Sequence, residues 1–197
     1  MFIKQETSNY INNLFDTYVD HKQSSDTKRM HPSVDEFSDV LQEINISQGD
    51  VSKIRIEETS NAFAVPIHAD LPKGSTTTLL PLKFKPSVWT ILFQSFYVGN
   101  NAEGCDYRPS NKKYYEDDEL HTDIENITSI TDNDFDQVQY EKYLSYMPKE
   151  DLYGLTISAS IEWQENKIIQ FPSNQLHSGS CFLDSKRWLR ILSTTSY

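Results

Sequence analysis

The feature that most constrains this chain is a long series of strand-forming runs. Apolar and polar residues alternate in Lys53-Ile-Arg-Ile-Glu and again in Leu155-Thr-Ile-Ser-Ala-Ser-Ile-Glu-Trp. A period of two places successive side chains on opposite faces of an extended strand, so both runs predict half-buried β-strands. Further runs rich in β-branched and aromatic residues span 63–68, 76–84, 88–98, 167–172, 175–179 and 186–194. At least seven strands are therefore expected.

The N-terminal residues carry a helical period instead. Residues 8–18 place apolar side chains at the i, i+3, i+4 and i+7 spacing of a helix, namely Ile11, Leu14, Phe15 and Tyr18. The polar residues 20–29 predict a loop. Ser33 with Glu36 three residues later matches a capping box, and a second helix is expected to follow it.

Several strands after N-terminal helices, in one domain of this size, predict a mainly β protein of the jelly-roll type. We expect a single domain of 197 residues. Residues 1–52 would give helical support, and residues 53–98 and 155–195 would form the β core. Residues 99–133 are polar and aperiodic, which predicts an insert loop or lid, and a short helix is expected at 134–147.

Charge and cysteine content exclude several classes of protein. The net charge of −11 makes nucleic-acid binding unlikely, because that binding relies on a cationic surface, and it disfavours attraction to anionic membranes. No apolar run approaches the ~20 residues that cross a bilayer, and Met1-Phe-Ile-Lys does not begin a signal peptide. Two cysteines allow no disulfide framework, so a reducing, cytoplasmic location is expected.

Two His-x-Asp motifs offer the clearest chemistry. They are His68-Ala-Asp70 and His121-Thr-Asp123, whereas composition alone predicts about 0.4 such motifs in the chain. Residues two apart on a strand share a face, so an imidazole and a carboxylate can reach one ion. A second imidazole, for which His177 is the candidate, would complete the facial triad of non-haem Fe(II) oxygenases.

Several segments, in order, carry a family resemblance. Residues 66–72, 78–82 and 88–94, followed by 155–163, 168–173, 176–180 and 186–192, are together similar to small Fe(II)/2-oxoglutarate-dependent oxygenases, which are common in phage and marine microbial sequences. The resemblance implies a double-stranded β-helix in which His68, Asp70 and His177 hold Fe(II). It also implies a dioxygenase that consumes 2-oxoglutarate and O2, releases succinate and CO2, and hydroxylates an unidentified substrate.

The resemblance also implies a basic residue on the last strand that binds the distal carboxylate of 2-oxoglutarate. Arg187 lies ten residues after His177, which is the family's usual spacing. Arg187 shares a strand face with Leu189 and Ile191, and Arg190 lies on the opposite face. We expect Arg187 to take this role. Arg190 and Lys186 stay open as alternatives, because the Ser or Thr that the family often has two residues after the basic residue is replaced here by Leu189.

Strand content favours His68 and Asp70 over His121 and Asp123. Two strong strands follow Asp70, whereas the segment before His121 is a charged loop that leaves too few strands to close a barrel. The presence of Asp70 also argues, by family analogy, against a halogenase. Two other classes remain open: a non-enzymatic β-sandwich, such as a binding or phage structural module, and a cupin-like metalloenzyme that does not use 2-oxoglutarate.

Overall fold

A computed structural model describes residues 1–19, 27–59, 66–71, 73–85, 87–99, 105–107, 124–126, 135–180 and 186–194. Its helical segments are α1 (Gln5–Val19), η1 (Asp35–Phe37), α2 (Ser38–Glu43), η2 (Gln48–Asp50), α4 (Gln137–Gln139), η3 (Tyr140–Leu144) and η4 (Lys149–Leu152). Its strands are β1 (Thr27–Met30), β2 (Val51–Thr59), β3 (Ile67–Ala69), β4 (Ser75–Lys83), β5 (Trp89–Tyr97), β6 (Cys105–Tyr107), β7 (Ile124–Glu125), β8 (Ile157–Glu162), β9 (Ile169–Pro172), β10 (Gln175–Gly179) and β11 (Lys186–Thr194).

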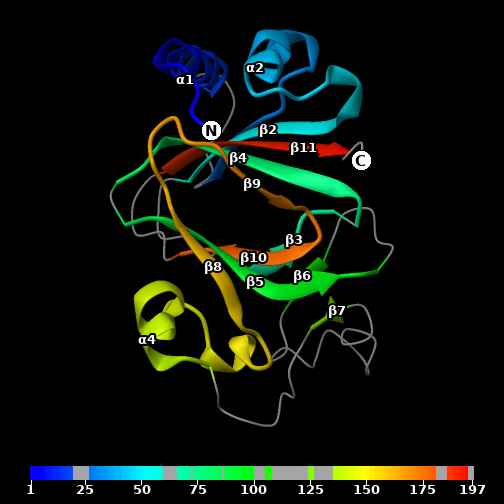
Figure 1. Cartoon of the computed structure of the whole chain (residues 1–197). Helices are drawn as coiled ribbons and strands as arrows, with labels where there is room; N and C mark the ends of the chain where they lie inside the picture. The colour runs from blue at the N-terminus through cyan, green and yellow to red at the C-terminus, as the bar shows by residue number, and fades with distance from the viewer. Residues whose placement is uncertain are drawn as a thin grey trace.

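Two antiparallel sheets face each other and form a jelly roll (Figure 1). One sheet has the order β1-β2-β11-β4-β9, and the other has the order β6-β3-β10-β5-β7, with β8 also paired to β5. The chain alternates between the sheets from β2 to β5 and again from β8 to β11. The mainly β jelly-roll expectation is therefore confirmed.

The helices cover the outer faces of the two sheets. Figure 1 shows α1 and α2 over the β2-β11-β4 sheet and α4 under the opposite sheet. Ile11 and Phe15 of α1 are fully buried, in one cluster with Ile56 of β2 and Ile191 of β11. The i, i+4 pair of α1 thus meets the apolar face of two alternating strands, which is how a helix and a sheet bury their hydrophobic surfaces together.

The local signals at the chain turns are confirmed. The Ser33 hydroxyl accepts a hydrogen bond from the Glu36 N–H, and the Glu36 carboxylate accepts one from the Ser33 N–H, as a capping box requires. Asn166, in the turn before β9, has a φ of 61°, a left-handed conformation that asparagine tolerates.

Three short strands occur where loops were expected. β1 begins within the polar 20–29 stretch and ends one residue after it, and β6 and β7 lie within the 99–133 insert. Each is two to four residues long and pairs at the margin of a sheet. Such strands take their stability from the neighbouring strand rather than from their own periodicity, so the sequence carries little sign of them. In the part of the chain that the structure describes, no helix has both the length and the apolar character needed to cross a membrane.

Candidate metal centre

Two neighbouring strands of the β6-β3-β10-β5-β7 sheet place His68 and His177 side by side. β3 and β10 are antiparallel, and His68 lies directly opposite His177 in their register. The two imidazole ring centres are 4.2 Å apart. Ile67 and Ala69, which flank His68, are buried on the other face of β3. The alternation of this strand therefore turns His68 into the space between the sheets.

Asp70 completes the group from the end of β3. Its backbone N–H donates to the Ser173 carbonyl over 2.9 Å, which fixes the chain as it leaves the strand. One carboxylate oxygen lies 3.7 Å from Nε2 of His68, and the other lies 3.5 Å from Nε2 of His177. The three ligand atoms all lie within 4.8 Å of one another, so His68, Asp70 and His177 could hold a metal ion.

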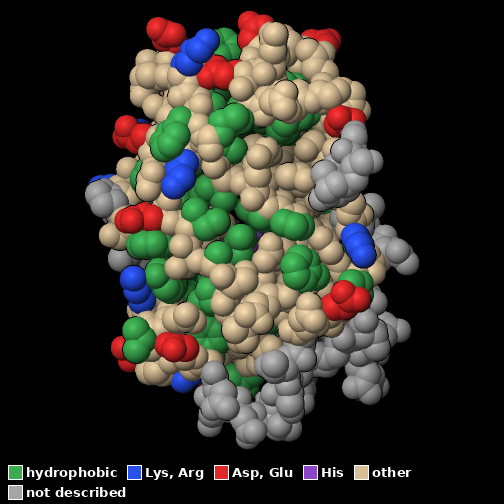
Figure 2. Space-filling model, in the orientation of Figure 1, with side chains coloured by type: hydrophobic (Ala, Val, Ile, Leu, Met, Phe, Trp, Pro, Cys, Tyr) green, Lys and Arg blue, Asp and Glu red, His purple; other side chains and the backbone are tan. Residues whose placement is uncertain are grey.

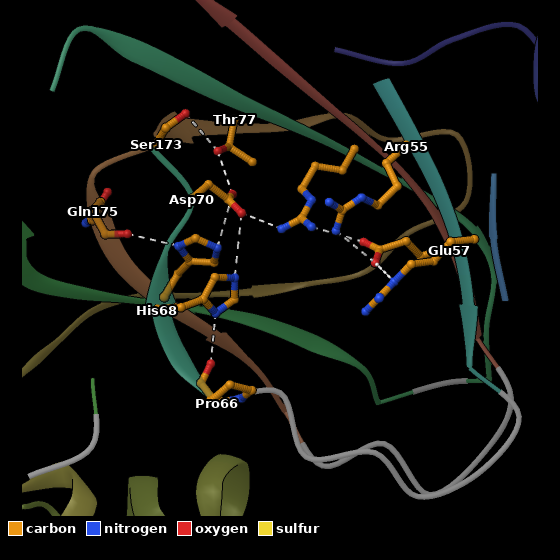
Figure 3. Close-up of polar contacts among 11 residues, drawn as sticks. Arg55, Glu57, Pro66, His68, Asp70, Thr77, Ser173 and Gln175 are labelled. Atoms are coloured by element: carbon orange, nitrogen blue, oxygen red, sulfur yellow. Dashed lines mark hydrogen bonds and ion pairs between the residues drawn. The ribbon is translucent and has the colours of Figure 1, made fainter. Parts of the chain in front are cut away.

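Backbone carbonyls orient both imidazoles (Figure 3). Nδ1 of His68 lies 2.8 Å from the Pro66 carbonyl, and Nδ1 of His177 lies 2.9 Å from the Gln175 carbonyl. A carbonyl can only accept, so each Nδ1 carries a proton, and in a neutral imidazole Nε2 then holds the lone pair. This is the arrangement that fixes histidine tautomers in metal sites, and here both lone pairs face Asp70.

Burial and charge set the protonation state of two of the three groups. Burial opposes ionisation of Asp70, but Arg190, His177, His68 and a hydrogen bond from Thr77 outweigh it and lower the pKa of Asp70 to about 2. Burial, with the charge of His68, lowers the pKa of His177 to about 3. At neutral pH the site therefore offers a carboxylate and a neutral imidazole, which are the forms that bind a metal.

The donor set fits a divalent transition metal. Two imidazole nitrogens and one carboxylate form the facial triad of non-haem Fe(II) sites, and they leave coordination positions open. Ligand atoms at about 2.1 Å from a common ion lie roughly 3 Å apart when they meet it at right angles. The three ligand atoms lie within 4.8 Å of one another, so they would have to move closer together to surround an ion.

Thr77 of β4 holds Asp70 from behind. Its hydroxyl donates to Oδ2 of Asp70 over 2.8 Å and lies 2.9 Å from the Ser173 hydroxyl. Because an outer-shell hydrogen bond fixes the direction of a ligand, we expect Thr77→Val to weaken Ni(II) or Fe(II) binding about 10-fold in a calorimetric titration. Thr78→Val is the matched control, since the Thr78 hydroxyl accepts from Gln170 and does not contact Asp70. Equal weakening by both variants would contradict this role.

Arg187 does not join this group. Its guanidinium forms ion pairs with Glu58 of β2 over 2.7 Å and with Asp16 of α1 over 2.5 Å, and it lies over the Phe15 ring of α1 at 4.5 Å. Its side chain is only 4% exposed. The reason is the face of β11 on which it lies: Leu189 and Ile191 share that face and pack under the helices.

Arg190 reaches the triad instead. Its Nη1 donates to Oδ1 of Asp70, and its Nη2 lies 3.2 Å from Oε2 of Glu57. The third basic residue of β11, Lys186, is buried and lies opposite Thr59 of β2. Of the three basic residues considered from the sequence, Arg190 is the one that the structure shows in contact with a triad residue.

Sequence reasoning missed the polar residues of β1 and β2 that lie beside Arg190. Glu57 is buried, and its carboxylate bonds to Arg29, Arg55 and Arg190. The signal was present in the alternation of 53–57, where Arg55 and Glu57 lie opposite the apolar face of Ile54 and Ile56. We interpreted that alternation only as a half-buried strand, although in a jelly roll the polar face of such a strand turns toward the site.

An apolar wall closes the other side of the space between the sheets. Leu92 of β5 lies opposite His177, and the Phe171 ring of β9 meets the His177 ring edge to face at 4.7 Å. Both belong to one buried cluster, against which Trp188 packs. Figure 2 shows hydrophobic side chains around a hollow in the middle of this face of the molecule. The competing pair His121 and Asp123 lies outside the described residues.

Comparison with known proteins bears on the fold. No protein-family model and no curated protein sequence matches this chain. Among solved structures, HygX from Streptomyces hygroscopicus with nickel and 2-oxoglutarate bound aligns with a TM-score of 0.54 at 6% identity, over 100% of this chain and 80% of that one. The non-heme alpha-ketoglutarate-dependent epimerase SnoN from nogalamycin biosynthesis aligns with a TM-score of 0.52 at 9% identity, over 98% and 76%.

HygX with nickel, 2-oxoglutarate and hygromycin B bound gives a TM-score of 0.51 at 7% identity, over 100% of this chain and 81% of that one. At these identities the likeness is one of fold. The chain therefore has a jelly-roll fold shared with HygX, which is seen with nickel and 2-oxoglutarate bound, and with the alpha-ketoglutarate-dependent epimerase SnoN, and it carries a His-Asp-His group that could bind a metal.

Proposed function

We propose that this protein is an Fe(II)- and 2-oxoglutarate-dependent oxygenase that hydroxylates a primary substrate. The observation that carries the proposal is the convergence of His68, Asp70 and His177 between the sheets of this fold, with an arginine in contact with Asp70. Bound together, Fe(II), 2-oxoglutarate and O2 would supply the oxidation of an unactivated C–H bond, with release of succinate and CO2. A reducing compartment such as the cytoplasm would keep the iron ferrous.

The residues of the chain have distinct tasks in this proposal. His68, Asp70 and His177 hold the ion, and the two backbone carbonyls behind the imidazoles keep their lone pairs directed at it. The wall of Leu92, Phe171 and Trp188 excludes water from one side of the site. Exclusion of water strengthens the electrostatic contacts inside such a site and limits side reactions.

We assign the distal carboxylate of 2-oxoglutarate to Arg190. A guanidinium matches a carboxylate in bidentate fashion, and Arg190 lies on the last strand, where the family resemblance places the basic residue. Arg187 is engaged by Asp16 and Glu58 on the other face of that strand. Lys186 shares the face of Arg190, four residues toward the start of β11, and is the alternative.

An anaerobic titration tests the proposal. Addition of 2-oxoglutarate to the protein with Fe(II) should produce a visible metal-to-ligand charge-transfer band, whereas succinate, which lacks the keto acid, should not. Metal uptake without the band would indicate a metalloenzyme of another kind. Absence of metal uptake would favour the β-sandwich binding module. Release of succinate on admission of O2 would complete the assignment.

A further inference from the structure

Three arginines from three adjacent strands meet on one buried carboxylate beside the metal centre. We call Arg29, Arg55, Arg190 and Glu57 the arginine cluster. Oε1 of Glu57 lies 3.0 Å from Nε of Arg29 and 3.3 Å from Nη1 of Arg55, and Oε2 lies 3.2 Å from Nη2 of Arg190. Figure 3 shows Arg55 and Glu57 to the right of Asp70, with Gln175 to its left.

Strand register forces these charges together. Arg55 of β2 lies directly opposite Arg190 of β11, and Arg29 of β1 lies opposite Glu57. Like charges directly opposite on neighbouring strands are destabilising, and the Glu57 carboxylate contacts all three guanidinium groups. Asp70 is a second carboxylate at Arg190, so three guanidinium groups gather beside the triad in a chain whose net charge is −11.

The cluster leads from solvent toward the triad. Side-chain exposure is 52% for Arg29, 18% for Arg55 and 17% for Arg190, and Asp70 behind them is only 4% exposed. Arg190 contacts both Asp70 and Glu57, whereas Arg29 and Arg55 form ion pairs with Glu57. Arg29 and Arg55 therefore lie one step farther from the metal centre than Arg190.

Arg55 keeps hydrogen-bonding capacity that the described residues do not use. Its Nε is buried and has no acceptor among them. A buried donor without an acceptor is costly, so such groups in native proteins usually serve a ligand or a water molecule. The pKa of nearby His31 is also lowered. Burial has the largest effect, the positive charges of Arg55 and Lys53 add to it, and together they outweigh the opposing effect of Glu57.

We propose that the primary substrate carries an anionic group, a carboxylate or a phosphate, that Arg29 and Arg55 bind while Arg190 binds 2-oxoglutarate. This inference rests on the proposed function for the separate role of Arg190. The fork-shaped guanidinium suits both oxyanions, and two arginines on adjacent strands would share their charge. The repulsion between the facing guanidinium groups of Arg55 and Arg190 is then partly offset by the anionic substrate.

Paired probes test this inference. The protein is loaded with Ni(II), a redox-inert substitute for Fe(II), and saturated with 2-oxoglutarate. Benzoate, phenyl phosphate and benzamide are then titrated by calorimetry at constant ionic strength. Benzamide has nearly the shape of benzoate without its charge. We expect at least one anion to bind 10-fold or more tightly than benzamide, and the tighter of the two identifies carboxylate or phosphate as the preferred group.

Charge-matched variants locate the binding. Arg29→Gln should weaken binding of the favoured anion about 10-fold or more, because a hydrogen-bonded charge is lost from the proposed substrate site. It should leave 2-oxoglutarate binding unchanged, because Arg190 is intact. Arg29→Lys, which keeps the charge but not the fork, should weaken it less. Lys28→Gln is the control: Lys28 is the preceding residue of β1 and lies opposite Glu58, on the other strand face. Thermal unfolding of each variant checks that it folds.

Three results would overturn the inference: affinities for benzoate and phenyl phosphate that both equal the affinity for benzamide, equal weakening by Arg29→Gln and Lys28→Gln, or loss of 2-oxoglutarate binding in Arg29→Gln. The last result would assign the cluster to the co-substrate and leave the proposed function standing. Failure of the proposed function has a different signature, because no charge-transfer band would form with Fe(II). Anion binding to the metal-free protein, with the same dependence on Arg29, would then still support the anion site.

Discussion

The Asp70→Ala substitution is expected to abolish both metal binding and 2-oxoglutarate turnover. Asp70 supplies the only charged ligand of the triad, and its carboxylate faces both imidazoles. Loss of an outer-shell partner alone weakens metal affinity by about 10- to 100-fold. Loss of the ligand itself should exceed that range. Metal affinity by calorimetry and succinate release with added Fe(II) are the two measurements.

Folding must be separated from ligation in this experiment. Asp70→Ala also removes the partner of Arg190, and breaking a buried ion pair from one side costs about 3 kcal/mol. Asp70→Asn keeps the shape and the hydrogen bond from Thr77, so it should lose metal with a smaller loss of stability. Asp39→Ala, on the exposed surface of α2, should change neither measurement. Full turnover in a folded Asp70→Ala protein would refute the ligand assignment.

Opposite effects are expected from the two arginines of β11. Arg190→Gln should raise the dissociation constant of 2-oxoglutarate about 10- to 100-fold, since a charged hydrogen-bonding partner is lost from the site. It should leave metal binding intact, because a cation that competes for Asp70 has been removed. The charge-transfer band, titrated with 2-oxoglutarate, measures this change directly.

Arg187→Gln should instead lower the stability of the fold. Its guanidinium is buried and links β11 to Glu58 on β2 and to Asp16 and Asn12 on α1. Removal leaves Glu58 without its cation, so we expect a loss of about 3 kcal/mol in the free energy of unfolding, measured with urea. Affinity for 2-oxoglutarate should stay within twofold of the parent protein. If Arg187→Gln were the variant that lost 2-oxoglutarate, the assignment to Arg190 would fail.

The contrast between these arginines shows where sequence reasoning reached its limit. Spacing from His177 favoured Arg187, and alternation established only that Arg187 and Arg190 face opposite ways. The deciding fact is which face of β11 lies under the helices. Leu189 and Ile191 indicate it, because α1 and α2 carry apolar stripes that require an apolar partner, and Arg187 shares the face of these two residues.

The proposed metal ligands were within reach of the sequence for a local reason. His68 and Asp70 are two residues apart at the end of a strand, so one backbone geometry places both on one side. His177 was linked to them by the order of strands along the chain, and the register of β3 with β10 sets the two imidazoles opposite each other. Thr77 gave no such local signal, and the alternation of 53–57 gave only the strand face of Glu57, because the contacts of both residues depend on which strands become neighbours.

The sequence by itself determined the strand periods, the apolar stripes of the helices, the capping box at Ser33 and the residue types of a facial triad. Each of these depends on a spacing of a few residues, and short spacings fix the direction of side chains within one element. Only the tertiary structure decided that Arg190 faces Asp70 and that Arg29 and Arg55 join it on Glu57. Those contacts join strands far apart in the chain, and their geometry follows from sheet order and register, which a local pattern does not specify.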